Sequence, residues 1–349
     1  MSKLKSLLIK IRSNIEIRTE IIKKRDYCVK RDNLVILLDT SIDSDNIGDQ
    51  IIMYFAERLL RPMLTEYKIV RVATHNYPSE KEIELMLKAR CVIVCGTNIL
   101  SPQMELYTGW KFNAKQIHLN NVVLMGVGWW GYKKTSMYSK FVYKNIFEKN
   151  CLQSVRDSQT ENELRKIGVT NVINTNCLTL WDLDENCTDI PIRKCNTVVF
   201  TVTGVYKDVF HDRLMLSILK NNYEKIVFWP QGIGDLQYYQ EYLYDEKIEV
   251  LDETLDAITC FLNKTETDYI GSRLHGGIYA LHFNKRTIVI AVDNRAIEIG
   301  RDTHLPVIRI ENIVDELQKK IRSEWETKLV LNKKNVIKWM DSLRNVLKN

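Results

Sequence analysis

Residues 270–277 place an arginine and a histidine, two positions apart, among glycines. A strand pattern ends at the start of this stretch, and an apolar segment typical of a helix follows at 278–282. Arg273 supplies a permanent positive charge, His275 titrates near neutral pH, and Gly276 permits close backbone approach. Beside the N–H groups that begin a helix, these residues favour binding of a small anion. A tight turn stabilised by a structural ion pair is the alternative for this motif taken alone.

Polar residues also follow other strand patterns. Asn46 and Asp49 open the helix after the first strand, where Asp49 suits a partner for a hydroxyl group or, alternatively, a helix-start acid. Arg156 ends a strand in the first half, whereas Gln231 and Arg295 follow strands in the second half. Because parallel α/β sheets bind ligands outside the carboxyl ends of their strands, all five residues are candidates for a substrate site.

A tryptophan pair, Trp129-Trp130, lies in a glycine-rich stretch after the fourth strand. An exposed tryptophan in a cleft can stack on a sugar ring, which makes Trp129 a candidate substrate-binding residue. A place in the hydrophobic core is the alternative for such a pair.

Strand and helix patterns alternate twice along the chain. This alternation predicts an α/β protein with two Rossmann-like, doubly wound domains and a cleft between them. The strands are expected at 33–39, 68–73, 91–95, 122–126, 152–156, 171–173, 197–203, 225–229, 248–251, 267–270 and 286–291. Helices are expected at 47–60, 79–88, 136–148, 158–167, 209–220, 257–262, 278–282 and 335–347.

The pattern also predicts where the domains begin and end. A basic amphipathic arm (1–32) precedes the first domain (33–183), and a polar linker (184–196) leads to the second domain (197–325). The C-terminal segment (326–349) contains a helix that we expect to cross back onto the first half.

Charge is concentrated at the N-terminus. Residues 1–32 hold ten Lys/Arg and four Asp/Glu, a net of +6 that equals the net charge of the whole chain. Leu4, Leu8, Ile11, Ile15 and Ile22 fall near one helical face, with Lys3, Lys10, Arg12 and Lys24 around the rest. The arm therefore predicts either a helix that rests on anionic lipid or a helix that packs on a domain. No basic-aromatic stripe continues beyond it, which argues against nucleic-acid binding.

Composition indicates a soluble globular protein of two domains, with 45% hydrophobic and 27% charged residues. The eight cysteines show no metal-ligand spacing and are interpreted as reduced thiols, so a cytoplasmic location is expected, peripheral to the inner membrane face if the arm binds lipid. No apolar run approaches the length of a membrane span.

Together these motifs resemble the polysaccharide pyruvyl transferase family. The resemblance covers most of residues 33–320 and depends on the order and spacing of its pieces. Three departures occur: Arg295 stands where the family often has Lys, Leu178 where it usually has Pro, and the turn near Gly96 keeps one glycine. The pieces are Asn46-x-Gly48-Asp49, Val155-Arg156-Asp157 with Leu164 and Gly168, Pro230-Gln231, Ser272-Arg273-Leu274-His275-Gly276 and Asp293-x-Arg295.

The resemblance implies a pair of glycosyltransferase-B-like (GT-B-like) domains that moves a pyruvyl group from phosphoenolpyruvate to two sugar hydroxyls of a cell-surface polysaccharide precursor. The first domain would hold the acceptor, which could be lipid-linked, and the second would hold phosphoenolpyruvate. Arg156, Arg273 and Arg295 would bind the phosphate and carboxylate, and His275 would protonate the enol methylene. Asp49, from the first half, would orient or deprotonate the acceptor hydroxyl.

Two alternatives remain open at this point. One is a nucleotide-sugar glycosyltransferase of the same architecture, and the other is a non-catalytic sugar-binding partner in the same pathway. Asp182-Leu183-Asp184 mimics a metal-binding motif, but it lies near the predicted linker, where a solvated or capping role fits. We therefore expect no metal and no cofactor, an expectation that chelator treatment would test.

Overall fold

The computed structural model describes residues 3–23 and 31–348 and divides into two compact units. Unit 1 comprises Met1–Asp43, Met53–Leu178 and Asn332–Asn349, and unit 2 comprises Ser44–Ile52 and Thr179–Leu331. The boundary between the units falls after Leu178, so the polar linker expected at 184–196 lies within unit 2. Ser44–Ile52, expected in the first domain, belongs to unit 2.

Unit 1 is built on parallel strands. Four of them form a sheet in the order β2-β1-β3-β4, and β5 and β6 form a parallel pair that the Val127–Val155 bridge joins to the segment after β4. Central β3 is buried along almost its whole length, which explains its continuous apolar sequence. The strands are β1 (Asp32–Asp39), β2 (Lys68–Ala73), β3 (Ala89–Cys95), β4 (Val122–Met125), β5 (Gln153–Val155) and β6 (Val172–Asn174).

Three helices of unit 1, α3, α4 and α5, begin after residues whose side chains cap them. Ser79 and Glu82 form a reciprocal capping box, and the Asp157 carboxylate accepts from Thr160 N. The helices are α1 (Lys3–Ile22), α3 (Glu80–Lys88), α4 (Met137–Ile146), α5 (Ser158–Lys166), α12 (Lys333–Lys348) and most of α2 (Ile47–Leu60), with short helices η1 (Arg61–Met63), η2 (Met104–Leu106) and η3 (Ala114–His118). The short helix η4 (Leu178–Leu180) spans the division between the two units.

Unit 2 contains one six-stranded parallel sheet. Its order is β12-β11-β10-β7-β8-β9, so the chain starts in the middle, builds outward to β9 and returns to β10 on the other side of β7. This is the classical order of a Rossmann domain. The strands are β7 (Thr197–Thr201), β8 (Lys225–Phe228), β9 (Glu249–Val250), β10 (Asp268–Gly271), β11 (Thr287–Ala291) and β12 (Val307–Arg309).

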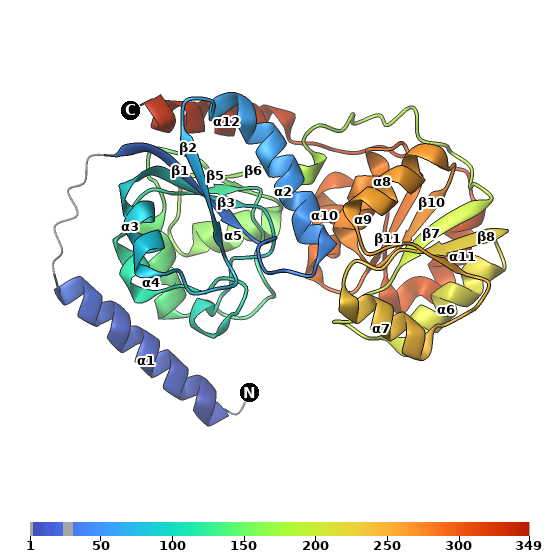
Figure 1. Ribbon diagram of the computed structural model, residues 1–349, viewed down its shortest axis with the longest axis horizontal. Helices are drawn as coiled ribbons and strands as arrows, with labels where there is room; N and C mark the ends of the chain where they lie inside the picture. The colour runs from blue at the N-terminus through green and yellow to red at the C-terminus, as the bar shows by residue number, and fades with distance from the viewer. Residues whose placement is uncertain (1–2, 24–30, 349) are drawn as a thin grey trace. The chain divides into compact units, whose positions relative to one another are not determined.

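Helices cover both faces of this sheet (Figure 1). One face carries α6 (Val209–Lys220), α7 (Ile233–Tyr242) and α11 (Ile313–Arg322), and the other carries α8 (Leu255–Lys264), α9 (Leu274–Leu281) and α10 (Asn294–Thr303). A short helix, η5 (Ile310–Asn312), precedes α11. Apolar side chains such as Phe200, Phe228 and Tyr239 fill the core on the α6 side.

The structure adds elements that the sequence did not predict. These are α7, α10, α11 and β12. In addition, α9 begins at Leu274 rather than at 278, so His275 lies in its first turn. Gly276 and Gly277 lower the intrinsic helix propensity of this turn, and packing against the sheet overrides that preference.

Candidate active site

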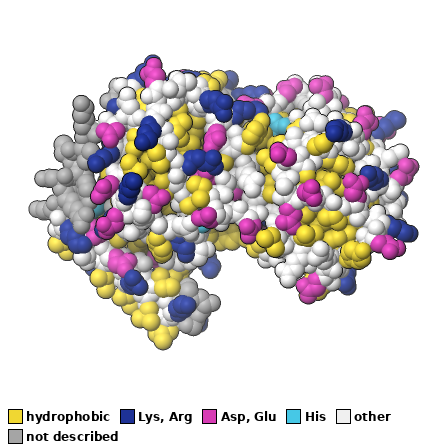
Figure 2. All heavy atoms as spheres, in the orientation of Figure 1, with side chains coloured by type: hydrophobic (Ala, Val, Ile, Leu, Met, Phe, Trp, Pro, Cys, Tyr) yellow, Lys and Arg dark blue, Asp and Glu magenta, His cyan; other side chains and the backbone are white. Residues whose placement is uncertain are grey.

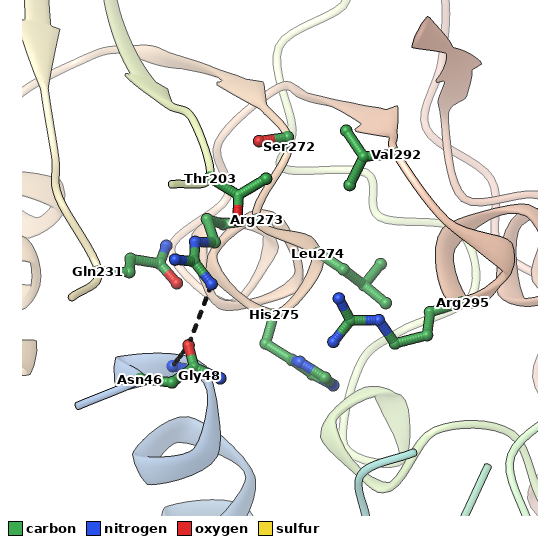
Figure 3. A pocket seen from close by; sticks show the side chains of 10 residues that line it. All are labelled: Asn46, Gly48, Thr203, Gln231, Ser272, Arg273, Leu274, His275, Val292 and Arg295. Carbon is green, nitrogen blue, oxygen red and sulfur yellow. Dashed lines mark hydrogen bonds between the residues drawn. The ribbon is translucent and has the colours of Figure 1, made fainter. Parts of the chain in front are cut away.

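A pocket in unit 2 contains most of the residues that the sequence singles out (Figure 3). All of its lining residues belong to this unit, because Asn46 and Gly48 lie in the segment Ser44–Ile52. Its lining consists of Asn46, Gly48, Thr203, Gln231, Ser272, Arg273, Leu274, His275, Val292 and Arg295.

The pocket lies where the strand order of unit 2 reverses. Thr203 follows β7 and Ser272 follows β10, the adjacent strands on either side of the reversal. Gln231 follows β8 and Arg295 follows β11, the next strand on each side. Loops diverge from the carboxyl edge at such a point, which is why ligands bind there in open parallel sheets.

Arg273 is fixed by a carboxylate that the sequence analysis missed. Its Nε donates to Asp235 Oδ2 at 2.8 Å, and its Nη2 pairs with Asp235 Oδ1. The buried Asp235 also accepts from the backbone N–H of Gly204 at 2.8 Å and of Gln231 at 3.2 Å. Asp235 therefore joins three loops and orients the guanidinium, whose Nη1 contacts Asn46 Oδ1 at 3.4 Å.

The first turn of α9 faces the pocket without a side-chain cap. Arg273 occupies the N-cap position, and its side chain makes no capping hydrogen bond. Backbone N–H groups at this end carry partial positive charge, which favours an anion. His275 lies in the same turn and lines the pocket at 7% exposure. Gly276 permits the tight packing here, because a Cβ would lie 2.1 Å from Gln231 Nε2.

Arg295 brings a second cation from α10. Its guanidinium pairs with Asp293, with an Nη2–Oδ2 distance of 2.6 Å, and points toward the space near His275 (Figure 3). Burial opposes its charged form, but Asp293 outweighs this effect and raises the pKa of Arg295. Ser272 Oγ is buried in the same pocket and has no hydrogen-bond partner among the described residues. Such an unsatisfied group is suited to a ligand oxygen.

The segment before α2 is tied to the pocket by its backbone. Ile47 N donates to Gln231 O at 3.0 Å. Asp49 accepts from Ser44 Oγ at 2.9 Å and from Asn46 Nδ2 at 3.1 Å, and it is buried beside the pocket rather than lining it. Asn46 is thus placed with Arg273, and the role of Asp49 toward a hydroxyl remains a prediction.

Two candidates lie in unit 1 instead. Arg156 is 1% exposed and donates to Asn98 Oδ1 at 2.8 Å and to Asp157 Oδ2 at 3.3 Å. Its guanidinium fills the space that a side chain on Gly128 would need. Trp129 is also 1% exposed and belongs to the hydrophobic core, so its indole is not the exposed sugar platform that the sequence suggested. The Trp129 ring packs against Tyr143 of α4, with the ring centroids 5.9 Å apart.

Comparison with protein families gives one match. Residues 46–214 match the sequence model of polysaccharide pyruvyl transferases. Residues 46–214 therefore form a polysaccharide pyruvyl transferase domain. The matched residues include Asn46, Asp49 and Arg156, while Arg273 and His275 follow them. This match implies a phosphoenolpyruvate-dependent pyruvyltransferase and confirms the resemblance found in the sequence. A search of curated proteins found no match.

Solved structures show the same fold. MnaA of S. aureus, solved with UDP, is similar with a TM-score of 0.50 and 12% identity over 90% of this chain and 98% of that chain. The UDP-GlcNAc 2-epimerase of Methanocaldococcus jannaschii, in complex with UDP-GlcNAc and UDP, has a TM-score of 0.51 and 11% identity over 88% and 99%. At this identity the likeness concerns the fold alone, and it confirms a GT-B-like pair of parallel α/β domains.

The described part of the chain shows no obvious metal centre. Over residues 3–23 and 31–348, no group of three or more His, Cys, Asp and Glu side chains is placed to hold a metal ion. Asp182 and Asp184 are both exposed and lie outside the pocket. Whether activity needs a metal remains a prediction. Within the same ranges, no helix combines the length and apolarity required to cross a membrane.

Proposed function

We propose that this protein transfers the pyruvyl group of phosphoenolpyruvate to two hydroxyls of a saccharide in a cell-surface polysaccharide precursor. The observation that carries the proposal is the convergence of Arg273, His275 and Arg295 on one pocket at the switch point of unit 2. The family match supports the same donor and the same class of reaction.

The pocket matches the charges of phosphoenolpyruvate. This donor carries a phosphate and a carboxylate, and the pocket offers two guanidinium groups together with the N-terminus of α9. The unsatisfied Ser272 hydroxyl supplies a further hydrogen bond. Arg156 is the third cation expected from the sequence, and we propose that it also binds the donor. We propose the same for Gln231, which lines the pocket.

His275 supplies the proton that starts the reaction. Protonation of the enol methylene makes a methyl group and leaves a positively charged carbon, which the first sugar hydroxyl attacks as it loses its proton. The C–O bond to phosphate then breaks, inorganic phosphate leaves with its bonding electrons, and the second hydroxyl attacks and loses its proton. One phosphoenolpyruvate and two hydroxyls thus give one ketal and one phosphate. We assign the orientation of the acceptor hydroxyl to Asp49.

Phosphate release tests this proposal. The full chain is incubated with phosphoenolpyruvate and candidate lipid-linked or nucleotide-linked sugars, and the His275→Ala variant is compared with His211→Gln, a histidine on α6 outside the pocket. Sugar-dependent release that His275→Ala abolishes and His211→Gln retains is the expected result. Turnover of a nucleotide sugar without phosphoenolpyruvate would instead support a glycosyltransferase, and sugar binding without either reaction would support a non-catalytic partner.

Helix α1 is assigned to an anionic lipid surface, which would bring the protein to a lipid-linked acceptor at the inner face of the membrane. Its apolar residues Leu4, Leu8, Ile11 and Ile15 are exposed, whereas Ile17 and Glu20 are buried within unit 1. Figure 2 shows apolar and basic side chains together in this region at the lower left. An exposed apolar stripe flanked by lysines and arginines suits the headgroup region of an anionic membrane. Lys24 of the predicted arm lies outside the described residues.

Vesicle sedimentation tests the lipid contact. The full chain is expected to sediment with phosphatidylglycerol-containing vesicles at low salt and to remain in solution with phosphatidylcholine vesicles. A triple variant, Leu8→Ser, Ile11→Ser and Ile15→Ser, should lose this sedimentation while keeping phosphate release with a soluble acceptor. If the triple variant and the wild-type protein sedimented equally with the phosphatidylglycerol-containing vesicles, α1 would have another role, such as packing on a neighbouring protein.

A further inference from the structure

A second cavity lies in unit 1, at the loops that follow two neighbouring strands. Residues 101–107 come after β3 and residues 130–133 after β4, so the cavity lies near the carboxyl edge of a parallel sheet. Its volume is about 570 Å³, within the range of small-molecule sites. The first turn of α1 supplies part of its wall through Lys3 and Ser6.

Three aromatic side chains line this cavity, and the loops that carry two of them, Tyr107 and Trp130, are bonded to each other. Tyr107 and Trp130 are stacked with their ring centroids 5.9 Å apart. The Tyr107 hydroxyl donates to Asn98 O at 2.6 Å, and Trp130 N donates to Leu100 O at 2.7 Å. These bonds join the two loops, so the aromatic pair does not have to be ordered when a ligand binds. Tyr132, whose side chain is 64% exposed, adds a third ring at the rim.

The remaining lining is polar and basic. Gln103 brings an amide, while Lys3 and Lys133 bring ammonium groups from two different segments. A sugar ring has an apolar C–H face that packs on aromatic side chains and hydroxyls that need hydrogen-bonding groups. A phosphate attached to that sugar would be attracted by the two ammonium groups. No carboxylate is among the residues that line the cavity.

We infer that this cavity binds the acceptor as a glycosyl phosphate, with the sugar on Trp130 and Tyr132 and the phosphate near Lys133 and Lys3. The inference rests on the proposed function, because it assumes that the protein uses a saccharide acceptor. Trp130, rather than its buried neighbour Trp129, is then the tryptophan that meets the sugar.

Calorimetric titration without phosphoenolpyruvate tests the cavity directly. The probes are hexose 1-phosphates, UDP-hexoses and short-chain prenyl-diphosphate hexoses, and the matching unphosphorylated sugars. Trp130→Ala and Tyr132→Ala are compared with Tyr244→Ala, an exposed tyrosine of unit 2. We expect the first two variants to weaken binding of the preferred probe about tenfold, and Tyr244→Ala to leave it unchanged. The preferred probe tells whether the phosphate comes from a free sugar phosphate, a nucleotide or a lipid carrier.

Lys133→Ala separates the phosphate contact from the sugar contact. It should weaken binding of phosphorylated probes about fivefold and have no effect on unphosphorylated ones. Misfolding is not expected to explain weaker binding by Tyr132→Ala, because Tyr132 is exposed and its truncation removes little buried surface.

Two results would overturn the inference. One is that the unchanged protein binds none of the phosphorylated probes, and the other is that Trp130→Ala and Tyr132→Ala bind them as the unchanged protein does. Failure of the proposed function looks different. In that case phosphoenolpyruvate-dependent phosphate release is absent from the unchanged protein, whatever its affinity for the probes.

Discussion

Two arginines follow parallel strands, one in each unit, and each is paired with a carboxylate. Arg273 follows β10 and pairs with Asp235, and Arg156 follows β5 and pairs with Asp157. The Arg273 side chain is 16% exposed and lines a pocket. The Arg156 side chain is 1% exposed and packs against the backbone of Gly128.

The two arginines differ in which guanidinium nitrogens stay accessible once the ion pair has formed. Arg273 uses Nε and Nη2 for Asp235 and directs Nη1 toward Asn46 at the pocket. Arg156 is enclosed by groups of its own unit. The outer nitrogen of Arg273 is therefore open to the pocket, whereas Nη1 of Arg156 is buried and has no hydrogen-bond partner among the described residues.

Removal of the pocket arginine should have the largest effect. Arg273→Gln is expected to lower kcat/KM for phosphoenolpyruvate about 100-fold or more, because charge-assisted hydrogen bonds are each about 1.5–3 kcal/mol. Arg301→Gln, an exposed arginine on α10, is the matched control. Because Arg273→Gln leaves Asp235 without its partner, Tm is measured as well. The variant Arg273→Lys, which retains the positive charge, is compared with it. An unchanged KM in a folded Arg273→Gln variant would contradict the site.

Removal of the enclosed arginine should act on stability. Arg156→Met is expected to lower the free energy of unfolding by about 3 kcal/mol, because Asp157 stays buried without its cation. Thermal unfolding and the KM for phosphoenolpyruvate are measured on the same sample. A tenfold higher KM with an unchanged Tm would show that Arg156 binds the donor, as the sequence predicts.

Neutralising the carboxylate partner should have an intermediate effect. Asp235→Asn keeps an acceptor for the Gly204 N–H but loses the charge that orients Arg273. We expect KM for phosphoenolpyruvate to rise about tenfold with a smaller change in kcat. Asp256→Asn, an exposed acid on α8, should leave both constants unchanged. If Asp235→Asn and Asp256→Asn lost kcat equally, Asp235 would have no specific role in positioning Arg273.

The buried acid Asp212, which is bonded to a tyrosine instead of an arginine, should affect stability in a pH-dependent way. Burial raises the pKa of Asp212 to about 6, although a 2.7 Å hydrogen bond from Tyr238 opposes this rise. The folded state therefore favours the protonated form, and stability falls as pH rises from about 4 to 6. Asp212→Asn should raise the free energy of unfolding by about 2 kcal/mol at pH 7.5 and leave it nearly unchanged at pH 4. A gain of equal size at both pH values would exclude titration of Asp212 as the cause.

Local sequence patterns were sufficient for much of the fold. The apolar runs of β3 and β11 are buried on both faces, and such runs are recognisable without tertiary information. Two regions with weak or unusual patterns were missed, namely α7, which has a glycine at its N-cap, and the glycine-containing first turn of α9. Helices α10 and α11 were missed as well, although their sequences are clearly amphipathic. For α7 and the start of α9 the helical state depends on packing, which a short stretch of sequence does not reveal.

The sequence by itself determined that Arg273 and His275 stand together at a strand-to-helix turn, because they are neighbours in the chain. Tertiary structure alone decided that Asn46 joins them, that Asp235 holds Arg273, and that Trp129 is buried while Trp130 lines a cavity. The physical reason is that ion pairs and burial depend on which loops meet in space. Asn46 and Arg273 are 227 positions apart, and only the fold brings them within 3.4 Å.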